Sequence, residues 1–565
     1  MEERNPEMRA HPDDVATVDA TATAHKGGIL FSLCLAALMI NIDVTIVNVT
    51  LPALVRELGA TTTDLQWVVD AYSLVFAALI LAAGSLSDRV GRKGILLVGL
   101  GVFAAGSLAG SLATTPGELI AARAVMGIGA AGIFPSTLSL IANVFTERGE
   151  RAKAIGLWGA TTGVGIATGP IIGGWLLEHF WWGSVFLFMV PVAAVVAGFI
   201  AATVPTSKDP DAAPLDRRGL RLSTAGMALL IFGIIQAPAW GWGSATTLAV
   251  LVAGIVVLSV FVAVERRTAR PMLDVALFKD MRFTAASGSI TFGFFTLTGF
   301  TFLITQYFQF VKDYSPLDTG VRLLPVALSV GAAAIVGTKL AVRIGNKAVV
   351  AGGLLLFGIT LLWIAGVASQ TTPYGVIALQ MVLGGSGLGL ITAPATEAIM
   401  GAVPAEKAGV GSAVNDATRL FGATLGVAVI GSIAASLYAN RLGATLPADV
   451  PSNIASVADG SVGGALTAAR QMVATGLTEP GRALSAAAID AFLHSLAGAL
   501  RVAAGVAFAG SVIAAIFLPS RPQAHTEPQP DEGPDPAIDE VPVPQRALES
   551  DAGSTPVATA GAKQP

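Results

Sequence analysis

Apolar stretches long enough to cross a bilayer recur along the whole chain, and short polar breaks separate most of them. A membrane-spanning helix needs roughly 20 predominantly apolar residues. Helices are the expected spanning element because every backbone polar group must find its partner within the span. The pattern predicts fourteen transmembrane helices, at residues 28–52, 67–87, 94–113, 118–145, 154–177, 182–204, 223–240, 246–264, 285–311, 323–342, 348–368, 374–401, 408–438 and 496–518.

Basic residues gather in every second loop, counted from the first span. Those loops contain Arg89, Arg92, Lys93, Arg148, Arg151, Lys153, Lys208, Arg217, Arg218, Arg221, Arg266, Arg267, Arg270, Lys279, Arg282, Arg343, Lys347 and Lys407. The intervening short loops contain only Arg56, Lys312 and Arg322. Lys and Arg mark the cytoplasmic side of a membrane protein. The sequence therefore predicts a multi-pass protein of the plasma membrane, surrounded by lipid, with both termini in the cytoplasm.

The polar breaks divide the chain into regions. We expect a cytoplasmic tail at 1–27, a six-helix bundle at 28–205, linkers with two extra helices at 206–282, and a second six-helix bundle at 283–519. Within the second bundle, 439–483 is expected on the extracellular side as a loop with at most one surface helix. The tail at 520–565 is rich in Pro, Ala and acidic residues, which predicts disorder.

The two predicted bundles contain a short repeat. Residues 89–93 read Arg-Val-Gly-Arg-Lys and residues 343–347 read Arg-Ile-Gly-Asn-Lys. Each segment lies between the second and third helices of its bundle. Similar halves that meet at a midplane site are typical of transporters that rock between two states.

Composition supports a membrane protein and excludes several function classes. The 565 residues are 53% hydrophobic and 13% charged, against roughly 25% charged in soluble domains. The net charge of -4 gives no reason to expect a nucleic-acid partner. Cys34 is the only cysteine and the five His are scattered, so we expect no metal site and no other cofactor. The sequence lacks the Gly-x-x-x-x-Gly-Lys-Ser/Thr loop, so we expect no nucleotide.

The loop after the second span joins a carboxylate, three cations and two glycines in ten residues. It contains Gly84, Asp88, Arg89, Gly91, Arg92 and Lys93. This segment resembles the signature loop of the major facilitator superfamily. The resemblance implies a latch between the two halves, in which Asp88 lies against the positive end of a helix from the other half. The alternative is a plain basic anchor on the cytoplasmic side.

The fifth span is rich in glycine, at Gly159, Gly163, Gly165, Gly169, Gly173 and Gly174, with Pro170 among them. This pattern resembles the antiporter motif of the same superfamily and thereby favours export over nutrient import. Glycines three and four residues apart also make a smooth face for helix packing. Ordinary small-residue packing is therefore the alternative interpretation.

Further segments resemble the fourteen-helix drug:proton antiporter branch, over about residues 28–519. They are 41–52 in the first span, 66–72 in the second, Arg123 with 127–131 in the fourth, and 411–419 in the thirteenth. The sequence departs from the family pattern at Gly183, Ser184 and Met189, which puts the usual polar contacts at the start of the sixth span in doubt. The resemblance implies an all-α major facilitator fold, with two six-helix bundles and two inserted helices.

Ionisable residues inside the spans indicate the mechanism. A charge at mid-bilayer costs at least about 2.5–3.5 kcal/mol, so such residues normally face a partner or a cavity. At 1.5 Å per residue, Asp43 and Arg123 lie at similar depths, roughly 13 and 9 Å from the outer ends of their helices. An ion pair between them is feasible. Asp43 is our first choice for the carboxylate that carries the proton, with a static ion pair as the alternative, and the resemblance implies a role for Arg123 in proton transfer.

Other polar residues in the spans are weaker candidates. Asp70, near the predicted outer mouth, is a second proton or cation site, or a simply hydrated carboxylate. Asp416 and Arg419 are three residues apart, a spacing that suits a local ion pair. Glu397 lies near the cytoplasmic end of its span and is expected to be a solvated end residue. The substrate cavity is expected to include Asn41, Asn48, Gln306, Gln309, Asn415 and Asp416. Aromatic residues of the ninth span suit flat or cationic ligands, and equally suit lipid.

The resemblance implies a secondary active exporter, not an enzyme, in which protons enter as small hydrophobic or cationic compounds leave. One alternative is an exporter of an endogenous metabolite, lipid or antibiotic. A second is a proton-coupled nutrient importer, and a third is a membrane enzyme or receptor. The third would need a catalytic constellation or a large folded domain, and neither is evident in the sequence.

Overall fold

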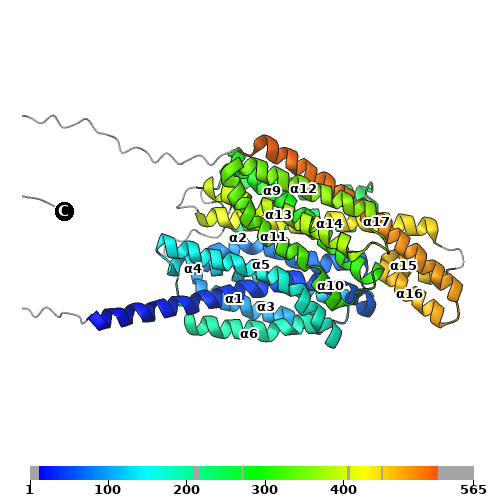
Figure 1. Ribbon diagram of the computed structural model, residues 1–565, viewed down its shortest axis with the longest axis horizontal. Helices are drawn as coiled ribbons and strands as arrows, with labels where there is room; N and C mark the ends of the chain where they lie inside the picture. The colour runs from blue at the N-terminus through cyan, green and yellow to red at the C-terminus, as the bar shows by residue number, and fades with distance from the viewer. Residues whose placement is uncertain are drawn as a thin grey trace, which may run out of the picture. The chain divides into compact units, whose positions relative to one another are not determined.

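The computed structural model describes residues 12–207, 216–268, 271, 273–403, 408–446 and 450–519. Within them, fourteen helices are long and apolar enough to cross a membrane, which confirms the predicted number. The predicted tail at 520–565 lies outside the described residues. Figure 1 shows the helices running roughly side by side, so that α1 begins on the same side as α17 ends. We call this the termini side, and the side where α1 ends the opposite side.

Two sets of six spanning helices form two halves of the molecule. The N-terminal half consists of α1 (Pro12–Leu58), α2 (Thr62–Val90), α3 (Arg92–Ser111), α4 (Pro116–Val144), α5 (Arg148–His179) and α6 (Ser184–Thr203). The C-terminal half consists of α9 (Met281–Gln306), η2 (Tyr307–Val311), α10 (Pro316–Arg322), α11 (Leu324–Ile344), α12 (Asn346–Val367), α13 (Tyr374–Gly401), α14 (Ala408–Thr445) and α17 (Thr478–Phe517). Here α9 and η2 make one span, and α10 and α11 make another.

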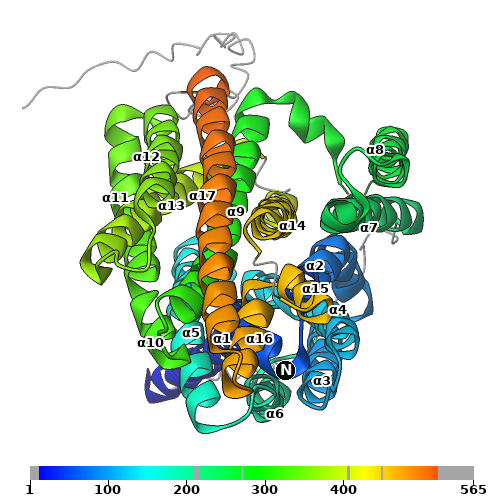
Figure 2. The same cartoon turned by 90° about the vertical axis from the view of Figure 1, so that its right-hand side faces the viewer.

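The inserted pair, α7 (Arg217–Trp240) and α8 (Ala245–Glu265), lies at the edge of the bundle (Figure 2). Helix α7 packs through Ile231, Ile234 and Ile235 against Leu74 of α2 and Ala428 of α14. It thus contacts both halves. A short helix, η1 (Val275–Lys279), connects the pair to the C-terminal half.

Hydroxyl side chains begin several helices on the opposite side. In each case the side chain accepts a hydrogen bond from the backbone N–H group three residues later. The pairs are Thr61 with Asp64, Thr115 with Glu118, Ser244 with Thr247, and Ser315 with Asp318. Such caps satisfy N–H groups that lack a partner inside the helix. At α2 the cap is reciprocal, because the Asp64 carboxylate accepts from the Thr61 N–H at 2.9 Å. These capping side chains define where the helices begin on the opposite side.

The repeated loops on the termini side have the same geometry in both halves. Gly91 and Gly345 each have positive φ, 133° and 89°, and each precedes the third helix of its half. Lys93 donates to the Ala201 carbonyl near the end of α6, at 2.8 Å. Lys347 donates to the Ile516 carbonyl near the end of α17, at 3.4 Å. In both halves the lysine therefore reaches the carboxyl end of the sixth helix.

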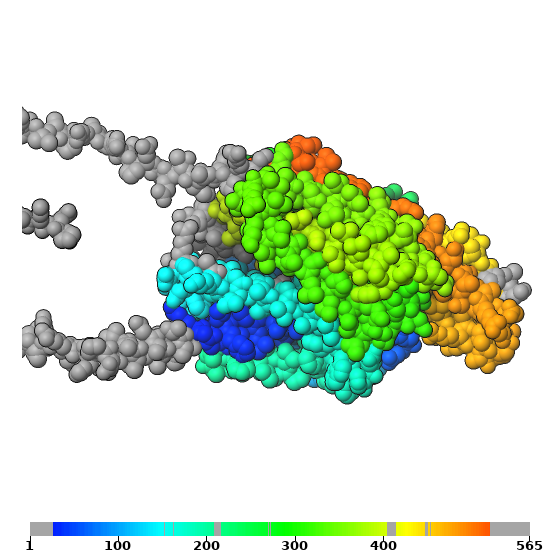
Figure 3. All heavy atoms as spheres, viewed as in Figure 1, coloured from blue at the N-terminus to red at the C-terminus, as the bar shows by residue number. Residues whose placement is uncertain are grey.

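The opposite side carries more structure than the sequence predicted. Instead of a loop with one surface helix, residues 439–483 include the end of α14, α15 (Ser452–Gly460), α16 (Val462–Ala474) and the start of α17. Helix α17 has 40 residues, about 60 Å at 1.5 Å per residue, which exceeds a bilayer core of about 30 Å. Alanine-rich sequence such as 487–491 favours this extension. Figure 3 shows the α15–α16 region projecting beyond the rest of the bundle.

The two halves are hydrogen-bonded to each other on the opposite side. The cross-half bonds run from Gln309 to the Val49 carbonyl at 2.9 Å, from Thr62 to the Gly460 carbonyl at 3.1 Å, and from the Leu317 N–H to Glu178 at 3.3 Å. Gln66, one turn into α2, adds bonds to α14. Among the described residues, no hydrogen bond joins the halves on the termini side. The structure is therefore closed on the opposite side.

Candidate transport site

A buried ion pair joins α1 to α4 inside the N-terminal half. Arg123 Nη1 donates to Asp43 Oδ2 at 2.8 Å, and the two side chains are 1% and 0% exposed. The sequence placed these residues at similar depths but could not show whether they face each other. The structure brings them together, so the feasible pair is present.

The guanidinium of Arg123 has two further partners from α2. Its Nε donates to the Val68 carbonyl at 3.1 Å, and its carbon lies 4.2 Å from the centroid of the Tyr72 ring. Such a cation over an aromatic face is attracted to the ring electrons. The arginine therefore links its own helix, α4, to α1 and α2. By contrast, Asp43 Oδ1 accepts no hydrogen bond from the described residues, so half of the carboxylate has no donor.

Asp70 is enclosed in α2 one turn after Gln66. Its side chain is 0% exposed, and neither carboxylate oxygen has a hydrogen-bond partner within the described ranges. Gln66 Nε2 donates to the Val427 and Ala428 carbonyls and to Ser432 Oγ, at 2.9 to 3.3 Å. Residues four apart share a helix face. Asp70 thus lies on the face of α2 that contacts α14, and it is not the exposed, hydrated carboxylate of the alternative interpretation.

The signature loop is held within its own half. Asp88 accepts from Arg92 Nε at 2.7 Å and from Ser139 Oγ of α4 at 2.9 Å. Arg89 is exposed, and a side chain added at Gly84 would contact Pro135. The sequence predicted a contact of Asp88 with a helix of the other half. Among the described residues this carboxylate has its partners in α3 and α4 instead.

The glycines of α5 divide into two groups. A Cβ atom at Gly165, Gly169 or Gly173 would collide with α1, at Asn41, Thr45 and Ile46 respectively. At Gly174 it would lie 2.5 Å from Leu317 of α10, in the other half, and a Cβ atom at Gly320 of α10 would collide with the Pro170 carbonyl. At Gly159 and Gly163 it would meet nothing within 4 Å. Close packing therefore explains the part of the motif near the opposite side, and leaves Gly159 and Gly163 unexplained in this state.

The C-terminal half repeats the close helix contact. A Cβ atom at Gly422 or Gly426 of α14 would collide with the Thr291 or Phe295 carbonyl of α9. Helices α14 and α9 are the fifth and first of their half, as α5 and α1 are of theirs. The glycine packing therefore belongs to the repeated frame of the fold.

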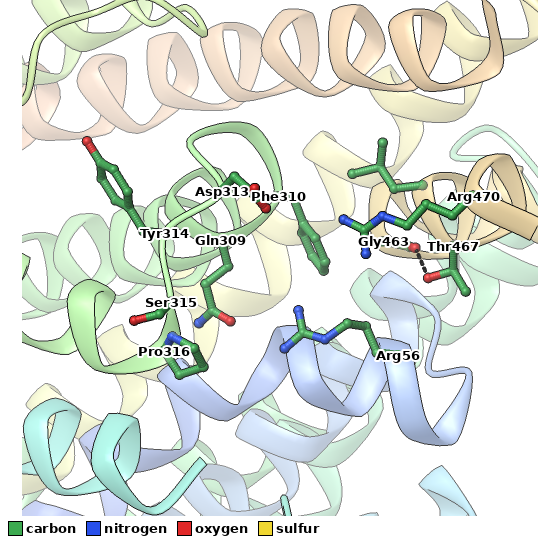
Figure 4. A pocket seen from close by; sticks show the side chains of 11 residues that line it. Arg56, Gln309, Phe310, Asp313, Tyr314, Ser315, Pro316, Gly463, Thr467 and Arg470 are labelled. Carbon is green, nitrogen blue, oxygen red and sulfur yellow. Dashed lines mark hydrogen bonds between the residues drawn. The ribbon is translucent and has the colours of Figure 1, made fainter. Parts of the chain in front are cut away.

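The residues predicted to line a substrate cavity do not share one environment. Asn41, Asn48 and Gln306 donate to the Ala37, Val44 and Phe302 carbonyls of their own helices. Asn415 accepts from Thr396 at 3.1 Å, and Asp416 beside it is half-buried. Arg419 donates to the same Thr396 hydroxyl, also at 3.1 Å. Gln309 alone of the six lines the cavity drawn in Figure 4.

The aromatic residues of the span formed by α9 and η2 are largely enclosed. Phe300, Phe302, Tyr307 and Phe308 are at most 4% exposed, so they face protein in this state and not lipid. The span ends in a π-helical turn, η2, which contains Gln309. Such turns are often found at functional sites.

Sequence reasoning missed three groups of α2 near the buried charged residues: Tyr72 and the Val68 carbonyl, which contact Arg123, and Gln66, which joins α2 to α14. Gln66 and Tyr72 belong to the second-span segment that carried the family resemblance, but neither was predicted to be a site residue. A glutamine and a tyrosine within an apolar span were the available signal. The Val68 carbonyl is a backbone atom, and no sequence pattern would have identified it.

A family model described as the Major Facilitator Superfamily matches residues 33–427. The chain belongs to the Major Facilitator Superfamily. Membership makes it a multi-pass membrane transporter of small molecules and not an enzyme, as predicted.

Relatives in the superfamily cover most of the chain. The multidrug efflux pump LfrA of Mycolicibacterium smegmatis is 36% identical over 484 residues, 84% of this chain and 95% of the relative. The methyl viologen resistance protein SmvA of Salmonella typhimurium is 34% identical over 470 residues, 83% and 94% of the two chains. The tetracenomycin C resistance and export protein of Streptomyces glaucescens is 33% identical over 524 residues, 90% and 94%.

Solved structures agree on the fold. A bacterial homologue of the human lysosomal transporter Spinster matches with a TM-score of 0.60 at 17% identity, covering 86% of this chain and 97% of that one. The predicted major facilitator fold is thus confirmed, with the two inserted helices present as α7 and α8.

Proposed function

We propose that this protein exports small hydrophobic or cationic compounds across the plasma membrane in exchange for protons. Three of its relatives are named for multidrug efflux, for resistance to methyl viologen, and for resistance to and export of tetracenomycin C. Methyl viologen is an aromatic dication, a cargo of the expected class. The basic loops favour a cytoplasmic termini side, and this orientation is part of the proposal. On that basis the halves are hydrogen-bonded to each other on the outer side.

The buried Asp43–Arg123 pair carries the proposal for proton coupling. A carboxylate in a low-dielectric site is ionised only while a cation stabilises it. Asp43 has Arg123 on one oxygen and no donor among the described residues on the other. A proton arriving at the second oxygen neutralises the carboxylate and weakens its attraction to Arg123. The pair therefore responds to protonation, and rocking of the halves would expose it to each side of the membrane in turn.

Asp70 is the proposed second acidic site. A buried carboxylate without a partner is costly, and uptake of a proton or a cationic cargo removes that cost. Its position on the face of α2 toward α14 puts it where the halves meet. Binding there would alter the contact between the halves, which links cargo to rocking.

The latch residues Asp88, Arg89, Arg92 and Lys93 are proposed to engage the C-terminal half in the other state. In the present state the Asp88 carboxylate is occupied by Arg92 and Ser139. Closure on the cytoplasmic side would bring the C-terminal half within its reach. Gly159 and Gly163, which face open space here, would then have helix neighbours.

Transport in proteoliposomes tests the coupling. In proteoliposomes of the unchanged protein, an imposed pH gradient is expected to drive methyl viologen against its own concentration gradient. The Asp43→Asn variant should lose this pH-driven transport. Cargo exchange at equal pH should persist in Asp43→Asn, because it needs rocking but no net proton transfer. Normal pH-driven transport by that variant would refute the assignment.

A matched control separates coupling from folding. Asp490 is an exposed carboxylate that pairs with Arg441 at 2.8 Å, far from the buried pair in sequence. Asp490→Asn should leave pH-driven transport unchanged. Because Asp43→Asn leaves Arg123 as an unpaired buried cation, the double variant Asp43→Asn/Arg123→Gln serves as a second test. It should also fold and exchange cargo without responding to pH.

Export of an endogenous product is the second candidate function. The likeness to the tetracenomycin C export protein, over 90% of this chain, favours it. Deleting the gene and comparing secreted metabolites separates the two, because a dedicated exporter leaves one product inside the cell. A nutrient importer would instead move cargo together with protons toward the cytoplasmic face. Counterflow experiments on inside-out vesicles, in which that face is outside, would show the direction.

A further inference from the structure

A cavity of about 290 Å³ lies on the opposite side, where α1, the turn after α9, and α16 meet. Its lining includes Arg56 from α1, Gln309 from η2, Asp313 from the turn after η2, and Arg470 from α16. Figure 4 shows both arginine side chains extending toward the ring of Phe310. The buried pair of Asp43 and Arg123 does not line this cavity. Of the residues predicted to line the cargo path, it contains only Gln309.

The two arginines have unused hydrogen-bonding capacity. Both arginines are exposed, and over the described ranges neither makes a hydrogen bond or has a carboxylate within 4.0 Å, so their five N–H donors are open to water or to a bound ligand. The two guanidinium groups border the same cavity, and Asp313 borders it with them. Of the side chains that line the cavity, two are cationic and one is anionic. The cavity is therefore positive overall.

Gln309 supplies a second, independent sign of a ligand. Its side chain is 6% exposed, and its Nε2 donates to the Val49 carbonyl at 2.9 Å. Its Oε1 accepts no hydrogen bond from the described part of the chain, although it is buried and borders the cavity. A group with both an anionic oxygen and an O–H could bond the arginines and this amide together.

The cavity spans the contact between the halves. Arg56 belongs to the N-terminal half, whereas Gln309, Asp313 and Arg470 belong to the C-terminal half. The walls touch closely, because a Cβ atom at Gly463 of α16 would lie 2.6 Å from Val55 of α1. Opening this side must separate Arg56 from Arg470. An anion bound to both arginines would therefore hold the two halves together on this side.

We propose that this cavity binds a small anionic phosphate group with an O–H, which bridges Arg56 and Arg470, donates to Gln309 Oε1 and stabilises closure of the opposite side. Arginine is suited to the task because its planar fork matches the oxygens of such groups. Dissolved hydrogen phosphate and a phosphatidylglycerol headgroup both present an anionic phosphate together with an O–H. The binding itself is independent of cargo, and only its effect on rocking rests on the proposed function.

Binding of inorganic phosphate to the full-length protein tests the proposal. The protein is placed in nanodiscs of neutral phosphatidylcholine and titrated with phosphate by calorimetry, at constant ionic strength. Arg56→Gln and Arg470→Gln are each expected to weaken phosphate binding at least about tenfold, since each removes one charged donor. Arg482→Gln is the matched control, because Arg482 is 72% exposed and pairs with Glu479. It should bind like the unchanged protein.

A distance measurement tests the effect on closure. Dyes are attached to Gly117→Cys and Leu477→Cys in a Cys34→Ser background. Gly117 begins α4 with open space around it, and Leu477 is exposed between α16 and α17. Phosphate should raise the population with the short distance, and the two arginine variants should respond at least about tenfold less sensitively. The same variants in nanodiscs with phosphatidylglycerol test the headgroup.

The outcomes separate the sources and the hypotheses. A response to phosphate in neutral lipid supports a dissolved anion, and one confined to phosphatidylglycerol supports the headgroup. Equal binding by Arg56→Gln, Arg470→Gln and Arg482→Gln overturns the proposal, as does the absence of any response in both lipids. Loss of pH-driven transport by a protein that still binds phosphate counts against the proposed function and leaves the cavity assignment intact.

Discussion

The two halves share a backbone frame of turns, helix ends and close helix contacts, and they differ in their buried charged residues. Both have a glycine of positive φ before the third helix, a lysine that reaches the end of the sixth helix, and a glycine face between the first and fifth helices. Yet Asp43, Asp70 and Arg123, the buried charged residues of the halves within the described ranges, all lie in the N-terminal half. In α13, the counterpart of α4, the buried polar residue about two turns from the start is Gln380.

This difference separates two kinds of constraint. A turn, a helix end and a close helix contact are backbone requirements, and each half must meet them to remain a rigid body during rocking. A buried ion pair serves proton chemistry and not backbone packing, and one copy suffices to couple the movement to a proton. We therefore expect substitutions in the frame to act alike in both halves, and substitutions of the buried polar residues to act very differently.

The largest contrast is expected between Arg123→Gln and Gln380→Leu. Removing Arg123 leaves Asp43 buried without its cation, which costs about 3–5 kcal/mol of stability. Gln380→Leu removes a buried amide whose Nε2 has no hydrogen-bond partner among the described residues, so it should cost less than about 1 kcal/mol or stabilise. Thermal unfolding of the detergent-solubilised proteins measures both.

The double variant Asp43→Asn/Arg123→Gln is the control for this contrast. It removes both charges and should recover a large part of the stability lost in Arg123→Gln. Equal losses for Arg123→Gln and Gln380→Leu would contradict the view that charge distinguishes the two halves.

A smaller and symmetric effect is expected from the glycine faces. Gly169→Ala and Gly426→Ala both place a methyl group against the first helix of the half, where it meets Thr45 or Phe295. Overpacking of this kind costs about 1–3 kcal/mol. Gly163→Ala should be neutral or slightly stabilising, because the added methyl group has open space in this state and alanine favours helix by about 1 kcal/mol. A loss in only one half, measured by the same unfolding assay, would argue against a shared frame.

Hydropathy and helical rise predicted much of the fold and the core of the candidate site. All fourteen spans were found because a bilayer imposes length and apolarity on each of them separately. Asp43 and Arg123 could be set at one depth because depth follows from residue counting. The part of α17 before residue 496 was missed, since an alanine-rich extension beyond the bilayer is not apolar enough to register as a span.

Contacts between distant segments could not be predicted in this way. The Gln309 bond to the Val49 carbonyl depends on a π-helical turn, whose register differs from that of an α-helix. The convergence of Arg56 with Arg470 depends on how α15 and α16 fold back over the end of α1. Neither arrangement follows from periodicity, because each is set by tertiary packing of residues hundreds of positions apart.

The smallest expected effect concerns the two lysines of the repeated loops. A cation at a helix carboxyl end contributes about 0.3–1 kcal/mol when exposed, and salt weakens the contribution. Lys93→Gln should cost more than Lys347→Gln, because the Lys93 bond to Ala201 is 2.8 Å long and the Lys347 bond to Ile516 is 3.4 Å. The losses should add in the double variant, since the sites lie in different halves and share no partner. Unfolding temperatures at low and high salt would reveal both features. A larger loss for Lys347→Gln, or a loss that salt does not reduce, would mean that the lysines stabilise the halves by something other than their charge at the helix ends.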